Sequence, residues 1–197
     1  MTTNQLTLDD IADARAYERE REAFRAEVIE LKKRRRVHLG PIMTLLFENR
    51  TTVRFQVQEM ARAEKILTDA GIQHELDTYN ALVPAPGGLC ATLFLELTDE
   101  WQLREWLPRL VGVERSLVLR LADGTEVRCT PEEEHEAALT REEVTAAVHY
   151  IRWHLTPTEV GQLAAGPVTL ACDHFQYGHE IVLPEETVAE LRADVQG

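Results

Sequence analysis

The sequence contains little cysteine and no long apolar segment. Its 197 residues include three cysteines, Cys90, Cys129 and Cys172, an odd number without a CxxC pair, which argues against a disulfide framework. Three thiolates also fall short of the four that an iron–sulfur cluster usually takes. The longest apolar runs are a handful of residues, whereas a membrane-spanning helix needs roughly 20, and the polar start MTTNQLTLDD lacks a secretory pattern. We therefore expect a cytoplasmic protein with reduced thiols and no membrane contact.

The signatures of several common enzyme classes are also missing. The sequence contains no P-loop, GxGxxG, GxSxG or HExxH pattern. Ordinary nucleotide hydrolysis, Rossmann-type redox chemistry and serine hydrolysis therefore have no support, and any enzymatic activity would have to use a less familiar arrangement.

Basic residues are scarce in the last two-thirds of the chain. Residues 1–70 carry 13 basic and 12 acidic side chains, whereas residues 71–197 carry 8 basic and 22 acidic ones, and the whole chain has a formal net charge of -13. The acidic remainder would repel nucleic acids and anionic membranes. An anionic partner must therefore meet the first third, and we expect no nucleic-acid partner because no aromatic stacking pattern accompanies its basic residues.

The first 80 residues predict mainly helix. Apolar residues recur every three or four positions, and Thr7 with Asp10 resembles a capping box that opens the first helix. Gly40-Pro41 would end this helix, and Gly71 would end the second. The expected elements are a helix over about 7–36, a strand over 43–47, a helix over 52–70 and a short helix over 72–79.

The remainder, after the loop PAPGG at 84–88, predicts strands and shorter helices. Alternating residues on both sides of Ala122-Asp123-Gly124 predict a hairpin, and TPTE at 156–159 is a capping box with proline at the first helical position. The expected strands are 91–97, 116–121, 125–130, 147–155 and 168–171, the expected helices are 99–110, 156–166 and 184–195, and the Glu-rich segment 131–143 is an exposed helix or loop.

This order of elements predicts the α+β class. We expect one domain over residues 1–197, in which a helical front (1–80) packs on a mainly antiparallel sheet built from the strand-rich remainder (91–197).

The basic run KKRRR, from Lys32 to Arg36, is the first candidate site. It could bind an acidic partner protein. Cations near the end of a helix also stabilise its dipole, by roughly 0.3–1 kcal/mol each when exposed. The structural interpretation is the favoured one.

The second candidate is a group of polar residues that follows the first predicted strand. On the next helix, Glu59 and Arg62 are three positions apart and can touch, beside an apolar stripe. Such groups form a paired structural network if buried, or line a polar cavity in which a carboxylate acts as base or ligand. The candidate ligand-binding residues are Glu48, Arg50, Gln56, Glu59 and Arg62, together with Tyr79 and Asn80 ahead of the Pro/Gly loop.

The third candidate is a metal site near the last predicted strand. Asp173 and His174 follow Cys172, and His149 lies on a nearby predicted strand. Imidazole, carboxylate and thiolate are all ligands of first-row metals, and this mixed set would suit iron or zinc. The alternative is that these histidines are exposed or hydrogen-bonded without a metal.

The order and spacing of several of these segments resemble a bacterial family catalogued as domain of unknown function 3501. The longer matching segments are KKRRRVHLGP at 32–41, TLLFENR at 44–50 and QVQEM at 56–60. Shorter ones follow in the same order: Glu75-Leu76, Tyr79-Asn80, His149-Tyr150 and Asp173-His174. Phe175 departs from the pattern, because a proline often follows the Asp-His pair in the family. The resemblance implies a cytoplasmic protein of about this length but no activity. It implies, by association only, a role beside rubrerythrin-like and iron–sulfur oxidoreductase-like proteins.

Three functional hypotheses follow. The leading one is a metal- or cofactor-associated accessory protein in redox or oxidative-stress metabolism, with an oxidoreductase as partner. The second is a non-catalytic interaction module that uses the basic run. The third is an enzyme acting on a small organic anion, in which Arg50 or Arg62 would hold the anionic group.

Overall fold

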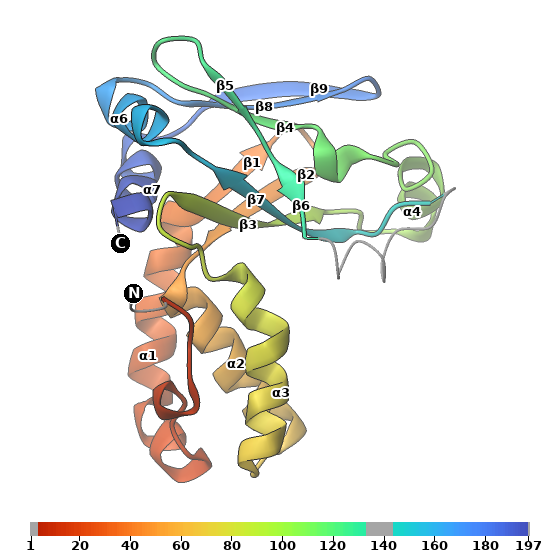
Figure 1. The fold of residues 1–197 in the computed structure, drawn as a ribbon. Helices are drawn as coiled ribbons and strands as arrows, with labels where there is room; N and C mark the ends of the chain where they lie inside the picture. Colours follow the sequence, from red (N-terminus) through yellow and green to blue (C-terminus); the bar gives the residue numbers. More distant parts are fainter. Residues whose placement is uncertain (1–3, 133–143, 197) are drawn as a thin grey trace.

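The computed structural model describes residues 4–132 and 144–196 and has the predicted α+β class. Two antiparallel sheets lie above three long helices that extend away from them together (Figure 1). The N-terminal helices are α1 (Ala14–Arg35), α2 (Arg50–Glu64) and α3 (Asp69–Tyr79), which we call the arm. The remaining helices are η1 (Leu8–Asp10), η2 (Asn80–Leu82), α4 (Glu100–Trp106), η3 (Val113–Arg115), α6 (Pro157–Ala165) and the C-terminal α7 (Glu185–Gln196).

The first sheet has the strand order β1-β2-β3-β7-β6 and the second β5-β4-β8-β9. The first comprises β1 (Arg36–Leu39), β2 (Met43–Glu48), β3 (Gly88–Leu95), β7 (Val148–His154) and β6 (Thr130–Pro131). The second comprises β5 (Glu126–Arg128), β4 (Leu117–Arg120), β8 (Thr169–His174) and β9 (Tyr177–Val182). One large apolar core joins side chains of both sheets with α6 and α7.

A tyrosine joins the two sheets at the β1–β2 turn. The Tyr177 hydroxyl donates to the carbonyl of Leu39 at 2.7 Å and accepts from the amide of Ile42 at 3.1 Å. Gly40 lies inside this contact with a φ of +70°, and a Cβ built there would lie 2.6 Å from the hydroxyl oxygen. Only glycine therefore fits the turn without strain.

The arm has a small core of its own. Val53 and Val57 of α2 pack with Leu76 of α3 and with Leu6 from the N-terminal segment. Residues 4–13, which we call the strap, run along the arm and are held by two side-chain amides. Asn80 accepts from the amide of Leu6 at 2.8 Å and donates to its carbonyl at 2.9 Å, and Gln58 makes the same pair of bonds with Ala12.

Several predicted boundaries in the first third were wrong. The capping-box residues at 7–10 open a single 3-10 turn, and α1 begins only at Ala14, because the Asp13 carboxylate accepts from the amides of Arg15 and Ala16. Arg36 starts a short strand that was not predicted, instead of ending the helix.

The predicted helices over 52–70 and 72–79 correspond to α2 and α3, but the predicted boundary between them was wrong. α2 ends where Lys65 takes a left-handed conformation, with a φ of 57°. α3 then starts after Thr68, whose hydroxyl accepts from the amide of Gly71. Gly71 is therefore inside a helix and not a stop signal.

The later elements agree better with the prediction. The hairpin of β4 and β5, the strands β3, β7 and β8, and the capped helix α6 are all present. The exposed strand β9 was missed. Most of the predicted segment 131–143 lies outside the described residues. Within the described ranges, no helix combines the length and apolar character needed to cross a membrane.

Candidate functional site

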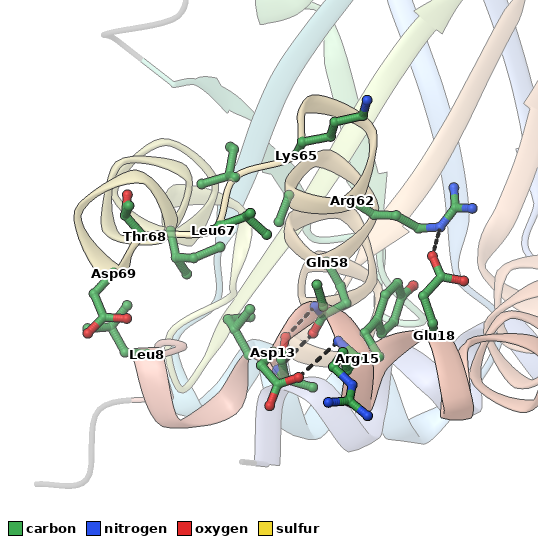
Figure 2. Close-up of a pocket in the computed structure, with 17 residues that line it drawn as sticks. Leu8, Asp13, Arg15, Glu18, Gln58, Arg62, Lys65, Leu67, Thr68 and Asp69 are labelled. Carbon is green, nitrogen blue, oxygen red and sulfur yellow. Dashed lines mark hydrogen bonds and ion pairs between the residues drawn. The ribbon is translucent and has the colours of Figure 1, made fainter.

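A pocket of about 540 Å³ lies at the free end of the arm (Figure 2). We call it the tip pocket. The start of α1, the end of α2, the start of α3 and the strap all contribute to its wall. Its apolar lining consists mainly of Leu8, Ile11, Ala61, Ile66, Leu67 and Ile72.

The break between α2 and α3 opens this space. After the left-handed Lys65, the amide of Ile66 donates back to the carbonyl of Ala61 at 2.8 Å, so the chain turns sharply out of the helix. Leu67 then lies at the mouth of the pocket with 76% of its surface exposed. An apolar side chain this exposed beside an apolar hollow is typical of a binding surface.

The strap forms one wall, and Gln58 holds it in place. The buried amide of this side chain donates to the carbonyl of Ala12 at 2.9 Å and accepts from its amide at 3.0 Å. Leu8 and Ile11 reach the pocket from the same segment. The pocket therefore depends on contacts between parts of the chain far apart in sequence.

Charged side chains surround the apolar lining. Arg62 forms an ion pair with Glu18 at 2.5 Å. Asp13 is the N-cap residue of α1, and its carboxylate accepts hydrogen bonds from the first backbone amides of that helix. Arg15 and Lys65 also line the pocket, and neither side chain has an ion pair or hydrogen bond with the described residues.

A polar network stands directly behind the wall. Tyr17 lines the pocket, is almost fully buried, and donates to Glu59 at 2.7 Å. Arg21 binds the same carboxylate with two nitrogens, each at 2.8 Å. This guanidinium lowers the pKa of Glu59 to about 2, whereas burial and the carboxylate raise the pKa of Tyr17. Glu59 is therefore ionised and Tyr17 neutral at neutral pH.

The predicted polar residues are divided between the two ends of the arm. Glu59 and Arg62 lie at the tip pocket, whereas Glu48 is buried on the first sheet. The Glu48 carboxylate accepts from Thr92 at 2.7 Å and from Thr52 at 2.5 Å. Both of its oxygens are thus satisfied, as in a structural network.

The remaining residues of this group have other contacts. Arg50 forms an ion pair with Asp10 at 2.6 Å. Gln56 is half-buried on α2, and its side-chain amide forms no hydrogen bond within residues 4–132 and 144–196. Tyr79 packs against the core of the arm, and Asn80 holds the strap.

The basic run is largely engaged within the chain. Arg35 is fully buried and forms ion pairs with Glu190 and Asp194 of α7. Arg34 also binds Glu190, at 2.7 Å. Lys33 pairs with Glu30 and Arg36 with Glu96, while Lys32 lies over the ring of Phe55. These contacts agree with the structural interpretation of the run.

The three predicted metal ligands are divided between the two sheets. His149 is on β7 and its Nε2 contacts the carbonyl of Ala146 and the hydroxyl of Thr145. Asp173, on β8, binds Arg128 with both oxygens, and this guanidinium lowers its pKa.

His174, on the same strand as Asp173, uses both ring nitrogens. Its Nε2 donates to the carbonyl of Val111 at 3.1 Å, and its Nδ1 accepts from the amide of Gln176 at 3.3 Å. In the part of the chain that the structure describes, no three His, Cys, Asp or Glu side chains are grouped to hold a metal ion. Iron or zinc binding by this set stays a prediction from the sequence.

All three cysteines are buried and free. Burial raises the pKa of the Cys90 and Cys129 thiols to about 12 and that of Cys172 to about 11. Because the thiolate is the reactive form, these are inert structural thiols at neutral pH.

Most residues of the tip pocket were not predicted from the sequence. Arg15 and Lys65 were not predicted because each looks like an ordinary residue of a surface helix, and Leu67 was assigned to the apolar stripe of the second helix. The signal that was present is Thr68 followed by Asp69, a good helix start that places the boundary between the two helices before residue 69 instead of at Gly71.

The regions of this chain that match known proteins include both the arm and the sheets. The model of a family described as "Protein of unknown function (DUF3501)" matches residues 5–195. The chain is also similar to a solved structure, a novel protein of unknown function from Burkholderia pseudomallei. Sequence identity is 39%, the TM-score is 0.89, and the alignment covers 97% of this chain and 99% of that chain. No match was found among curated proteins.

Proposed function

This chain belongs to the DUF3501 family of proteins of unknown function, and we propose that it is a binding protein for a small, largely apolar molecule. The proposed site is the tip pocket. The observation that carries the proposal is the pocket itself, with about 540 Å³ of space and a mainly apolar lining. Small-molecule sites in proteins usually have volumes of roughly 300–1,000 Å³ and linings of this kind.

The chemistry of the wall favours binding over catalysis. The two shifted groups behind it, Glu59 and Tyr17, have pKa values moved away from neutrality, so neither is suited to proton transfer near pH 7. Among the described residues that line the pocket there is no histidine or cysteine to act as nucleophile or metal ligand. An apolar site without these groups can hold a ligand but has little means to transform it.

The other hypotheses have weaker geometric support. An interaction module that uses the basic run would have to recruit Arg34 and Arg35, which are engaged by α7. An enzyme for a small organic anion would use Arg50 or Arg62. Arg50 pairs with Asp10 and does not line the tip pocket. Arg62 does line it, but its guanidinium is paired with Glu18. The metal-associated redox role and its oxidoreductase partner stay predictions.

The proposal is tested with N-phenyl-1-naphthylamine, a neutral fluorophore whose emission rises in apolar surroundings. We expect one saturable site per chain. Ala14 is exposed at the mouth of the pocket, so Ala14→Trp should fill it and weaken binding by about tenfold or more.

Ala70→Trp provides the matched control. Ala70 is exposed on α3 but does not line the pocket, so this variant adds the same indole elsewhere on the arm and should bind as the wild type does. Urea unfolding of both variants checks that the fold is kept. Unsaturable binding, or equal affinity in the two tryptophan variants, would contradict the proposal.

A further inference from the structure

We infer that the ligand of the tip pocket is an amphipathic organic anion, with an apolar chain or ring inside the pocket and one carboxylate or sulfonate group at its mouth. This inference rests on the proposed function and adds the charge and position of the polar group. The inference follows from a comparison of the charged side chains around the pocket, some of which form ion pairs or hydrogen bonds within the protein and some of which do not.

Three cations and three carboxylates line the pocket, and the ion pair of Arg62 with Glu18 uses one of each. Arg15 and Lys65 line the pocket, and their side chains have no ion pair with any described residue. Arg62 is the third cation, and it is neutralised by Glu18 at 2.5 Å. The amide of Ala16 and, more weakly, the charge of Arg15 lower the pKa of Asp13, so Arg15 acts on this carboxylate without an ion pair. Arg15 and Lys65 are therefore the two cations whose side chains can still form an ion pair with a ligand.

The acidic side chains nearby are already stabilised. Asp13 accepts two backbone amides at the start of α1, each at 2.9 Å. Asp69 lies in the first turn of α3, where the helix dipole favours a negative charge. The same dipole disfavours a cation in the first turn of α1, where Arg15 lies, so an anion bound there would offset an unfavourable placement.

The charge of the rest of the chain makes this preference selective. The formal net charge is -13, so small anions are repelled from most of the surface, while residues 1–70 carry a slight positive excess. The tip pocket lies almost entirely within this first part, since Ile72 is the one lining residue beyond position 70. An apolar anion that accumulates on this protein should therefore do so at the tip pocket.

The test compares three ligands that share a ten-carbon chain: decanoate, decanol and decylammonium. The affinity of each ligand is measured by how well it displaces N-phenyl-1-naphthylamine from the wild-type protein at low salt. We expect decanoate to bind about tenfold more tightly than decanol, because two weak charge contacts together contribute about this factor. Added salt should reduce the affinity for decanoate and leave that for decanol nearly unchanged.

The double variant Arg15→Gln/Lys65→Gln should lose the advantage of decanoate while keeping the affinity for decanol. Arg19→Gln/Arg25→Gln is the matched control, because it removes two exposed cations of α1 that do not line the pocket. This control should keep the decanoate preference.

The outcomes separate the inference from the proposed function. If decanol binds as tightly as decanoate, and Ala14→Trp weakens both, the pocket binds apolar molecules but the inferred anionic group is wrong. A preference for decylammonium, or an equal loss of decanoate affinity in both double variants, also overturns the inference. If none of the three ligands displaces the fluorophore, the proposed function fails as well.

Discussion

Replacing Arg35 by methionine should destabilise the fold far more than the same change at its neighbour Arg34. Arg35 is 0% exposed and forms ion pairs with Glu190, at 3.0 Å, and with Asp194, whose side chain is 9% exposed. It also donates to the carbonyl of Phe47 at 2.8 Å. Removing one partner of a buried pair leaves an uncompensated charge, at a cost of about 3–5 kcal/mol. Arg34 is 42% exposed, so its loss should cost no more than about 1 kcal/mol.

The pH dependence gives a second, independent readout. Burial raises the pKa of Asp194 above its ordinary value of 3.8, even though Arg35 opposes this. Since the pKa is higher in the folded than in the unfolded state, protonation of Asp194 favours folding. Arg35→Met removes the opposing charge and raises this pKa further. The stability deficit of the variant should therefore be largest at neutral pH and shrink as the pH falls toward 3.8.

Urea unfolding at neutral pH and at about pH 5 measures both effects. The double variant Arg35→Met/Asp194→Leu should recover much of the loss, because an apolar pair can replace a buried ion pair. Equal losses for Arg35→Met and Arg34→Met would refute the reasoning, as would a deficit that grows on acidification.

Three further results are expected. Gly40→Ala should lower the free energy of unfolding in urea by about 2 kcal/mol more than Gly112→Ala. Both glycines have a positive φ, but only a Cβ at Gly40 would meet a neighbour, the Tyr177 hydroxyl. Equal losses in the two variants would contradict this. Gln58→Ala should speed proteolytic cleavage within the strap and leave the sheets resistant, because the strap loses two hydrogen bonds; unchanged cleavage there would count against it. All three thiols should resist iodoacetamide at pH 8 until urea exposes them, and fast labelling of the folded protein, read by mass spectrometry, would show that burial does not protect them.

Local signals explain which elements the sequence predicted well. The helix α6 begins with Thr156 and Pro157, whose capping box and fixed φ specify a helix start without help from distant residues. The hairpin of β4 and β5 likewise follows from alternating residues around a glycine turn, and the register confirms it. Signals of this kind act within four or five residues, so a single sequence contains them in full.

The missed elements depend on contacts that no short segment contains. β1 has four residues and continues directly from α1, so its sequence RVHL looked like the end of a basic helix. β9 is an edge strand with five exposed residues, and it lacks the alternation of a half-buried strand. Lys65 takes a left-handed conformation, which is uncommon for residues other than glycine, so a lysine at this position does not mark a helix end in the sequence.

The candidate site was predictable only in part, for the same reason. Glu59 and Arg62 were identified because they lie together on one helix turn. Their partners Tyr17 and Glu18 are about 40 positions away in the sequence, so spacing could not predict these pairs. Without the pairs, the sequence could not decide between a structural network and a cavity.

The strap links ligand binding to local stability, which gives a final test of the proposed site. Leu8 and Ile11 reach the pocket from the strap, and Gln58 and Asn80 hold the backbone that carries them. A ligand that needs this wall binds only when the strap is docked, so it must stabilise the docked state. At about 100 times its dissociation constant it should do so by about 2.7 kcal/mol.

Hydrogen exchange of the strap amides, with and without N-phenyl-1-naphthylamine, measures this stabilisation. Exchange should slow by up to about 100-fold for the amides of Leu6 and Ala12, which bond to the side chains of the arm. Amides of β4, in the body of the sheets, serve as the control and should change little. Fluorophore that binds in one saturable site yet leaves strap exchange unaltered would place that site somewhere other than the tip pocket.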